Sequence, residues 1–200
     1  ANMSHEIRTP LNGILGMDEM IIRESKESKI RDYALEIKSA GNTLLSIIND
    51  ILDLSKIESG NFEIIPVEYD VASALNDVLN MTRHRAQKKG LGFNLSVFET
   101  IPSVLYGDEI RIRQILLNLL TNAVKYTDMG GFTLKVIGVE KTNETCRIKF
   151  SVRDTGIGIK EEDMEKLFMA YERLDEHKNS QIEGTGLGLA ITKQMVDLME

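Results

Sequence analysis

The chain has 200 residues, of which 42% are hydrophobic and 28% charged, and its formal net charge is -7. This composition indicates one or two globular domains, and the acidic balance argues against a nucleic-acid-binding protein, which needs a basic surface. No apolar run approaches the ~20 residues that cross a bilayer, so we expect no direct membrane contact from this segment. The single cysteine, Cys146, excludes an internal disulfide and is typical of a reducing compartment.

The first 58 residues have the periodicity of helices. Apolar residues recur at intervals of seven positions and, in the second half, also three positions after each of these, as in a coiled-coil seam. The seam consists of Ile7, Ile14, Ile21, Ile30, Tyr33, Ile37, Ala40, Leu44, Ile47, Ile51 and Leu54. A short polar stretch at residues 23–28 predicts an antiparallel helical hairpin. Two helices cannot bury this seam alone, so we predict a homodimer in which two hairpins form a four-helix bundle.

The rest of the chain mixes helical and strand periods. Residues 59–61 end the second helix, and a linker over residues 59–66 leads to a second domain over residues 67–200. We predict helices at residues 71–89, 109–126 and 187–199, and strands at residues 91–98, 131–139 and 145–153. The last two strands are joined through residues 141–144, which predicts an antiparallel pair and an α+β domain.

The segment around His5 predicts an exposed nucleophile on the first helix. At about 100° per residue, Ile7 lies roughly 200° from His5, so burial of Ile7 turns the imidazole outward. Thr9 shares the His5 face, and Glu6 is adjacent. When an imidazole attacks phosphorus, the other ring nitrogen loses a proton, which the Glu6 carboxylate can accept as general base. Pro10 cannot donate a backbone hydrogen bond, so the helix is expected to loosen there. Alone, this pattern is more simply a solvated helix face.

Polar side chains form a stripe on the helix predicted at residues 109–126. Asn118, Asn122 and Lys125 fall at positions i, i+4 and i+7, although asparagine is a poor helix former. An amide oxygen can ligate magnesium while phosphates and waters complete the octahedron, and a lysine ammonium offsets phosphate charge. The stripe therefore indicates a phosphate site, and the simpler alternative is a solvated face.

Asp154 follows the strand predicted at residues 145–153. It has the parity of the apolar residues of that strand, so we expect its carboxylate to point inward, where an adenine amino group can satisfy it. Guanine presents a carbonyl oxygen at that position, so the carboxylate predicts adenine selectivity. Gly156 and Gly158 let the backbone approach a base closely. The alternative is an ordinary turn after a strand.

Three glycines, Gly184, Gly186 and Gly188, precede the last predicted helix. Their backbone amides and the helix N-terminus can cradle phosphates, although neither the Rossmann nor the Walker pattern fits. We expect the polar stretch at residues 175–183 to form a lid over the nucleotide.

Taken together, four segments in this order resemble the catalytic core of sensor histidine kinases. They comprise residues 4–11, 118–126, 154–158 and 184–189, and the resemblance covers nearly the whole chain. It implies an α/β sandwich of the Bergerat type with a mixed, largely antiparallel sheet, as in heat-shock chaperones and type II topoisomerases. It also implies an ATP-dependent protein-histidine kinase of a two-component system, with ATP and Mg²⁺ as cofactors and a response-regulator receiver domain as partner.

The resemblance implies a role for individual residues. His5 is the phosphoacceptor, and Thr9 orients the hydrolytic water in a phosphatase reaction toward the partner. Asn122 holds magnesium, and Lys125 and Tyr126 contact phosphates. The other nucleotide-binding residues that it implies are Asn118, Asp154, Gly156, Gly158, Gly184, Thr185, Gly186, Leu187 and Gly188.

Two further segments bear on catalysis. Asn118 stands where related ATP hydrolases carry a catalytic glutamate, and an amide cannot deprotonate water, so transfer to a histidine is favoured over hydrolysis. Residues 167–173 resemble the F box of the family, in which Arg173 reaches the terminal phosphate. Phe168 and Tyr171 would anchor the lid there, with Tyr171 replacing a common phenylalanine.

Two other functions are considered beside the kinase. A non-catalytic or phosphatase-biased, nucleotide-regulated interaction module is kept open by the departures from the F box at Met169 and Tyr171. A chaperone-like ATPase is disfavoured by Asn118 and leaves the segment around His5 unexplained. Since the chain opens inside the first motif, we expect a cytoplasmic fragment of a longer, membrane-associated sensor protein.

Overall fold

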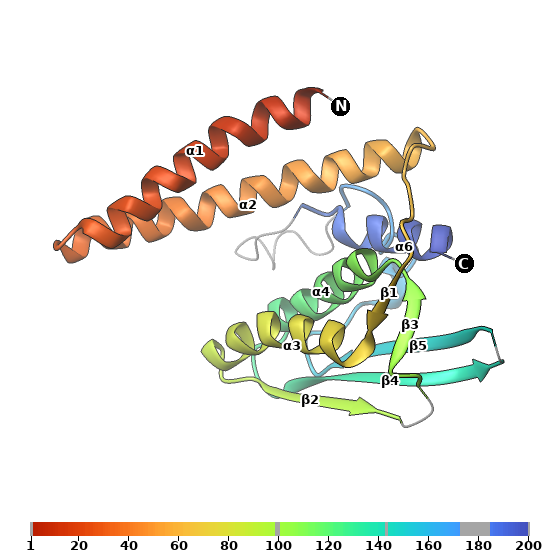
Figure 1. Ribbon diagram of the computed structural model, residues 1–200. Coiled ribbons are helices and arrows are strands. Elements are labelled where there is room, and N and C mark those ends of the chain that lie inside the picture. Colours follow the sequence, from red (N-terminus) through yellow and green to blue (C-terminus); the bar gives the residue numbers. More distant parts are fainter. Residues whose placement is uncertain (1, 99–100, 143, 173–184, 200) are drawn as a thin grey trace. The chain divides into compact units, whose positions relative to one another are not determined.

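The chain folds into two compact units, residues Ala1–Phe62 and Glu63–Glu200. The computed structural model describes residues 2–98, 101–142, 144–172 and 185–199, and for residues 2–5 it describes the backbone alone. Figure 1 shows the helices of the first unit and the mixed helices and strands of the second. No helix in the described part of the chain has the length and apolar character needed to cross a membrane.

The first unit is the predicted antiparallel hairpin. Helix α1 (Asn2–Glu24) runs through Pro10 without interruption, and α2 (Ser28–Glu58) returns beside it. Arg8 Nη2 donates to Asn49 Oδ1 over 3.1 Å. Lys38 Nζ donates to Glu19 Oε1 over 2.9 Å, and this hydrogen bond lowers the pKa of the Glu19 carboxyl. The end of α2 is also as predicted, with Gly60 at φ 68°.

The two helices approach closely along one stripe. Gly41 permits this approach, because a Cβ atom there would lie 2.6 Å from Leu15 Cδ2. Leu11 and Asp18 of α1 and Ala34 of α2 are buried. Neither carboxylate oxygen of Asp18 has a hydrogen-bond partner among the described residues. The hairpin therefore carries an unpaired buried acid in its own interface.

Most of the predicted seam lies outside this stripe. Ile7 is 44% exposed, so the chain alone does not supply the burial of Ile7 that we expected. The internal interface uses Leu11, Leu15 and Asp18, which lie about 20–80° further round α1 than Ile7, so Ile7 is left at the margin of this stripe. The other exposed seam residues are Ile14, Ile21, Ile30, Tyr33, Ile37, Leu44 and Ile51.

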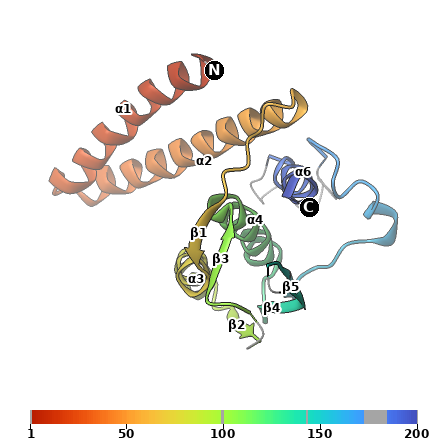
Figure 2. The ribbon, with the colours of Figure 1, turned by 45° about the vertical axis from the view of Figure 1, so that its right-hand side comes forward.

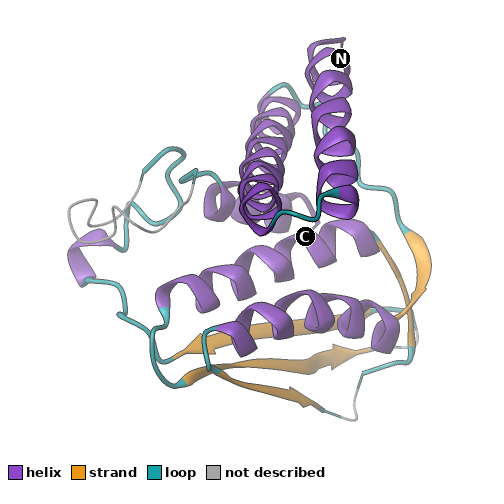
Figure 3. Ribbon diagram, turned by 90° about the vertical axis from the view of Figure 1, so that its left-hand side faces the viewer, coloured by secondary structure: helices purple, strands orange, loops and turns teal. Residues whose placement is uncertain are grey.

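The second unit confirms the predicted α+β class, with a mixed, largely antiparallel arrangement of strands. Its central sheet has the order β2-β4-β5, where β2 (Gly92–Val97) is parallel to β4 (Gly131–Lys141) and β4 is antiparallel to β5 (Cys146–Asp154). Helices α3 (Val71–Lys88) and α4 (Glu109–Tyr126) cover one face of this sheet (Figure 3). Helix α6 (Gly188–Met199) packs against α4 (Figure 2). A 3-10 turn, η1, spans Glu161–Asp163.

The core of this unit lies between the sheet and the two covering helices. The rings of Phe93 and Phe132 are 4.9 Å apart between centroids. Fully burying a leucine or valine side chain contributes roughly 1.5–3 kcal/mol, so the apolar faces of α3 and α4 fix both helices on the sheet. The most enclosed side chains are Val78, Leu116, Leu120, Leu134 and Val136.

Two short strands were not predicted from the sequence. Strands β1 (Val67–Asp70) and β3 (Val104–Gly107) form a separate antiparallel pair. Each has four residues, which is too short for an alternation of apolar and polar residues to stand out. Their pairing defines them instead, with Val67 opposite Gly107 and Asp70 opposite Val104. At the end of β1 the Asp70 carboxylate accepts from Ser73 N at 2.6 Å and caps α3.

We predict that Asp18→Leu stabilises the hairpin. Removing a buried, unpaired carboxylate should raise the free energy of unfolding by about 1–3 kcal/mol. Thermal and urea denaturation followed by circular dichroism would measure this change. Asp32 is exposed on α2, so the control Asp32→Leu should change the unfolding free energy by less than about 0.5 kcal/mol. Destabilisation by Asp18→Leu would contradict the prediction.

Candidate nucleotide-binding site

Helix α4 begins at a buried aspartate that joins it to the start of the second unit. Asp108 Oδ1 accepts from Arg111 N at 3.1 Å, and Asp108 Oδ2 accepts from Ile65 N at 2.9 Å. Nearby, burial raises the pKa of the Tyr69 phenol, and the Glu109 carboxylate adds to this shift. These contacts fix the first turn of α4.

The predicted polar stripe lies on α4 and meets the start of α6. Asn118, Asn122 and Lys125 are half-buried, while Leu116 and Leu120 of the same helix face the core. Asn118 Nδ2 donates to the hydroxyl of Thr192 over 2.8 Å.

The first residue of α6, Gly188, lies against this amide. A Cβ atom at Gly188 would lie 2.4 Å from Asn118 Oδ1, so only glycine fits here without a shift. The contact places the beginning of α6 directly over the middle of α4. The hydrogen bond of Thr192 to Asn118 was not predicted from the sequence, because the position of Thr192, four residues into α6, carries no signal of a contact with α4.

The end of α4 holds the loop that follows Asp154. Ile157 N donates to the Tyr126 carbonyl over 3.1 Å. A Cβ atom at Gly156 would lie 2.2 Å from that same carbonyl oxygen, which explains the glycine. Gly158 adopts φ 71°, in the region that favours glycine. The second and third motif segments therefore meet at one helix end.

Asp154 lies at the rim of the sheet. Its register partner is Phe132, whose side chain is buried, so Asp154 is on the sheet face that the helices cover. The residue itself is exposed, because β5 ends there, and this corrects the expectation of an enclosed carboxylate. Asp154 Oδ1 accepts from Gly156 N over 2.9 Å. The carboxylate is accessible to a base that lies over Gly156.

The glycine-rich segment is described from Thr185 onward. Gly186 adopts φ 71°, and Leu187 is buried. The hydroxyl of Thr185 accepts from Leu187 N over 3.1 Å. Gly184 lies outside the described residues, as do Arg173 and the expected lid at residues 175–183.

The segment that resembles the F box contacts the glycine-rich segment through its backbone. Tyr171 N donates to the Gly186 carbonyl over 3.2 Å. Tyr171 has φ 66°, which is uncommon for a residue with a side chain. Phe168 and Tyr171 are both exposed, and the Lys193 ammonium lies 5.7 Å from the Phe168 ring centroid.

The hairpin carries the predicted phosphoacceptor segment. His5 lies in the first turns of α1, and its side chain is outside the described part. Glu6 and Thr9 are exposed on the same helix. Their positions are compatible with access from solvent.

The ligands near the stripe suit a metal bound mainly through phosphates. Within the described residues, no group of three or more His, Cys, Asp or Glu side chains could hold a metal ion. Asn122 supplies an amide oxygen one turn beyond Asn118, and magnesium typically takes few protein ligands beside substrate phosphates and waters. The residues present therefore fit Mg²⁺ carried by a nucleotide.

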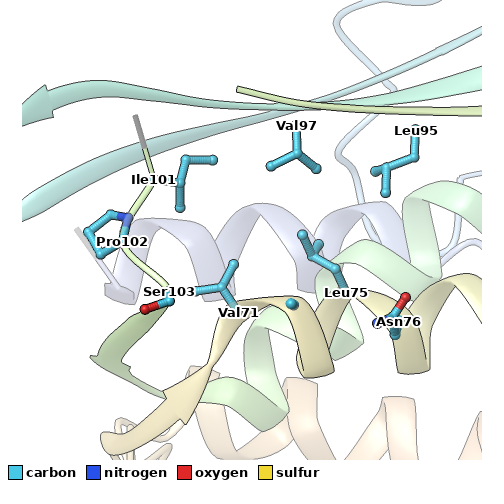
Figure 4. A pocket seen from close by; sticks show the side chains of 9 residues that line it. Val71, Leu75, Asn76, Leu95, Val97, Ile101, Pro102 and Ser103 are labelled. Carbon is cyan, nitrogen blue, oxygen red and sulfur yellow. The ribbon is translucent and has the colours of Figure 1, made fainter. Parts of the chain in front are cut away.

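A separate pocket of about 300 Å³ lies between α3 and the edge strand β2 (Figure 4). It shares no residue with the stripe on α4 or with the glycine-rich segments. Side chains from both elements point into it, and most are apolar. The lining residues are Val71, Ala72, Leu75, Asn76, Leu95, Val97, Ile101, Pro102 and Ser103.

Comparison with known families decides what this arrangement belongs to. Residues 1–60 match the His Kinase A (phospho-acceptor) domain, and residues 107–200 match the histidine kinase-, DNA gyrase B-, and HSP90-like ATPase family. The chain belongs to the histidine kinases. Its second unit is accordingly an ATPase-type nucleotide-binding domain, and the first is a phosphoacceptor-type hairpin.

Individual relatives of this histidine kinase chain are similar along its whole length. The signal transduction histidine-protein kinase BarA of Escherichia coli K12 is 38% identical over 199 residues, and the sensor protein GacS of Pseudomonas syringae is 40% identical over 199 residues. The hybrid signal transduction histidine kinase L of Dictyostelium discoideum is 42% identical over 196 residues. The matches cover 98–100% of this chain but only 22%, 22% and 12% of these relatives.

Solved structures of histidine kinases have the same fold. Full-length ShkA in complex with AMPPNP matches with a TM-score of 0.78 and 34% identity, over 100% of this chain and 40% of that one. The Acinetobacter baumannii histidine kinase AdeS matches with a TM-score of 0.61 and 24% identity, over 96% of this chain and 86% of that one. The AdeS match supports the fold alone.

We predict that Gly188→Ala destabilises the second unit through Asn118. The added methyl group displaces either the Asn118 amide or the start of α6, at a cost of about 1–3 kcal/mol in the free energy of unfolding. Denaturant unfolding would measure this cost. In the background of Asn118→Ala, which removes the clashing oxygen, the same substitution should cost clearly less.

The control for this prediction is Gly107→Ala. A Cβ atom at Gly107 would make only an ordinary contact, 3.7 Å from Tyr69 Cε1. Equal costs of Gly188→Ala in both backgrounds would show that the substitution acts without Asn118.

Proposed function

We propose that this chain is a histidine autokinase. It transfers the γ-phosphate of ATP to His5, and the phosphoryl group then passes to an aspartate of a response-regulator receiver domain. One observation carries the proposal: α4 presents Asn118, Asn122 and Lys125 on one face, with the Asp154 loop bonded to its end and α6 beginning against its middle. A nucleotide at this place meets base, metal and phosphate ligands together.

Each ligand has a distinct part in binding. The accessible Asp154 carboxylate accepts a hydrogen bond from the adenine amino group, over the close backbone of Gly156. Asn122 ligates Mg²⁺, which neutralises phosphate charge when it is bound. Lys125 and Tyr126 contact the phosphates, and the amides from Thr185 to Gly188 form a cradle at the start of α6.

The transfer step uses residues of the hairpin. A nitrogen of the His5 imidazole attacks the γ-phosphorus, the bond from that phosphorus to the β–γ bridging oxygen breaks, and ADP leaves. The proton on the other ring nitrogen passes to the Glu6 carboxylate. Arg173 offsets charge on the phosphoryl group during transfer, and Thr9 orients a water molecule in a phosphatase reaction with the receiver domain.

The division of labour follows the two parts of the chain. Residues 1–58 serve dimerisation and phosphotransfer, residues 59–66 act as a linker, and residues 67–200 bind ATP. The whole protein extends beyond this segment, with the segment on the cytoplasmic side of a membrane-associated sensor. The 22% share of the bacterial relatives that the chain covers supports a longer protein.

The autokinase predicts a phosphohistidine at one position. Incubation with γ-labelled ATP and magnesium should give a label that is acid-labile and base-stable, because a phosphoramidate is hydrolysed in acid. The label should disappear in His5→Gln and in Asn122→Ala. It should persist in the control His84→Gln, since His84 is an exposed residue of α3.

Other outcomes of this experiment would favour the alternatives. ATP binding without any label would favour a nucleotide-regulated interaction module. Steady hydrolysis of ATP by His5→Ala would favour a chaperone-like ATPase. A label that remains in His5→Gln would contradict the assignment of the phosphoacceptor.

The exposed seam of the hairpin predicts a dimer interface. Leu44 is 47% exposed on α2 in the seam of seven-residue repeats, so Leu44→Arg should weaken dimerisation at least tenfold, by about 1.4 kcal/mol or more. Sedimentation equilibrium would measure the dimer dissociation constant. Leu35 is 52% exposed on α2 outside the seam and offers a matched control, Leu35→Arg, which should leave the dimer intact. The reverse pattern would place the interface on another face.

A further inference from the structure

The C-terminal end of α4 is capped by Lys89, the residue that follows α3. Lys89 Nζ donates to the carbonyls of Val124 and Lys125, each over 3.0 Å, and to the carbonyl of Thr127 over 3.4 Å. The last carbonyls of a helix lack partners within the helix, and a cation is favourable there because of the helix dipole. The Asp128 carboxylate lies 3.8 Å from the same ammonium.

The backbone beneath this lysine is itself fixed. Lys89 follows α3, and its N–H bonds to the Ala86 carbonyl over 3.1 Å. Gly90 adopts φ 68° and lets the chain reverse, and Leu91, which is buried, donates from its N–H to the Ala86 carbonyl over 3.0 Å. Because both ends of the contact belong to packed elements, the ammonium holds α4 in place relative to α3.

The last turn of α4 is shared between two partners. Lys89 donates to the carbonyls of Val124 and Lys125 and to that of Thr127 just beyond the helix, whereas Ile157 in the loop after Asp154 donates to the carbonyl of Tyr126. The placement of the Asp154 loop therefore depends on a helix turn that Lys89 supports. Asn122 lies before this turn, in the regular part of α4.

We propose that Lys89 is a positioning residue for the nucleotide site. It holds the last turn of α4 so that the Asp154–Gly158 loop and the Lys125 side chain keep their places around a bound nucleotide. The inference rests on the proposed nucleotide site. It adds a residue from outside the four motif segments, in which Lys89 has no part.

The proposal predicts that nucleotide affinity and magnesium dependence respond differently to loss of the ammonium. Without the ammonium, the turn that supports base and phosphate contacts loosens, whereas Asn122 stays within the hydrogen bonds of the helix. Affinity for the nucleotide should fall, and the dependence on magnesium should stay as it is. If Lys89 served only overall stability, its substitution would change neither the nucleotide affinity nor the magnesium dependence, or would change both together.

The test compares Lys89→Met with Lys89→Arg and with Lys88→Met. Calorimetric titration with ADP should give a dissociation constant raised at least about tenfold in Lys89→Met, as expected for lost hydrogen bonds to a charged group. Lys89→Arg should recover most of the affinity, since it keeps the charge and the donors. Lys88, the exposed neighbour of Lys89, supplies the matched control, and Lys88→Met should bind ADP as the parent does.

Two further readouts separate positioning from a general loss of structure. The magnesium concentration at half-maximal ATP binding should be unchanged in Lys89→Met, and autophosphorylation should show a raised KM for ATP with kcat largely retained. If Lys89→Met does not fold, Lys89→Gln, which keeps a shorter donor, takes its place in the same measurements.

The possible results distinguish failure of the Lys89 inference from failure of the proposed nucleotide site. Parent-like ADP affinity in a folded Lys89 variant would overturn the inference while leaving the nucleotide site intact. A lower kcat with unchanged KM, or an equal loss in the Lys88 control, would also overturn it. Failure of the parent itself to bind ADP would overturn the proposed function and this inference together.

Discussion

The nucleotide site depends on how α4 is held along its length. Its apolar face is buried against the sheet through Leu116 and Leu120, which leaves Asn118 to face α6. Both ends are fixed by charged side chains, the N-cap Asp108 at the first turn and Lys89 from the end of α3 at the last. A rigid helix of this kind can present several ligands in one geometry, as a site that must select a nucleotide and a metal requires.

The hairpin carries two stripes of side chains, one between its own helices and one available to a partner. One stripe joins α1 to α2 and brings the helices close at Gly41, while most of the seam of seven-residue repeats stays exposed. Exposed apolar residues in a regular row are costly in a lone hairpin, so the seam favours association with a second copy. The buried, unpaired Asp18 works against the internal stripe, and the hairpin is consequently less stable than its apolar content suggests.

Much of the fold follows from sequence periodicity. The helix at residues 109–126 was predicted with the bounds that α4 has, because a long amphipathic pattern between an N-cap and a polar turn is unambiguous. The four-residue strands β1 and β3 were missed, since they are defined by pairing and not by pattern. For Asp154, strand parity predicted the sheet face but not the exposure, which depends on where β5 ends. The contact of Asn118 with Gly188 and the cap by Lys89 join residues far apart in the chain, so no local sequence pattern predicts these two contacts.

A crystal structure of this chain with Mg²⁺ and AMPPNP would show most directly whether α4 organises the site. We expect the adenine amino group on the Asp154 carboxylate, the metal on the Asn122 amide oxygen and the phosphates beside Lys125 and the start of α6. A nucleotide bound elsewhere, or a metal coordinated without Asn122, would contradict the central claim that α4 organises the site.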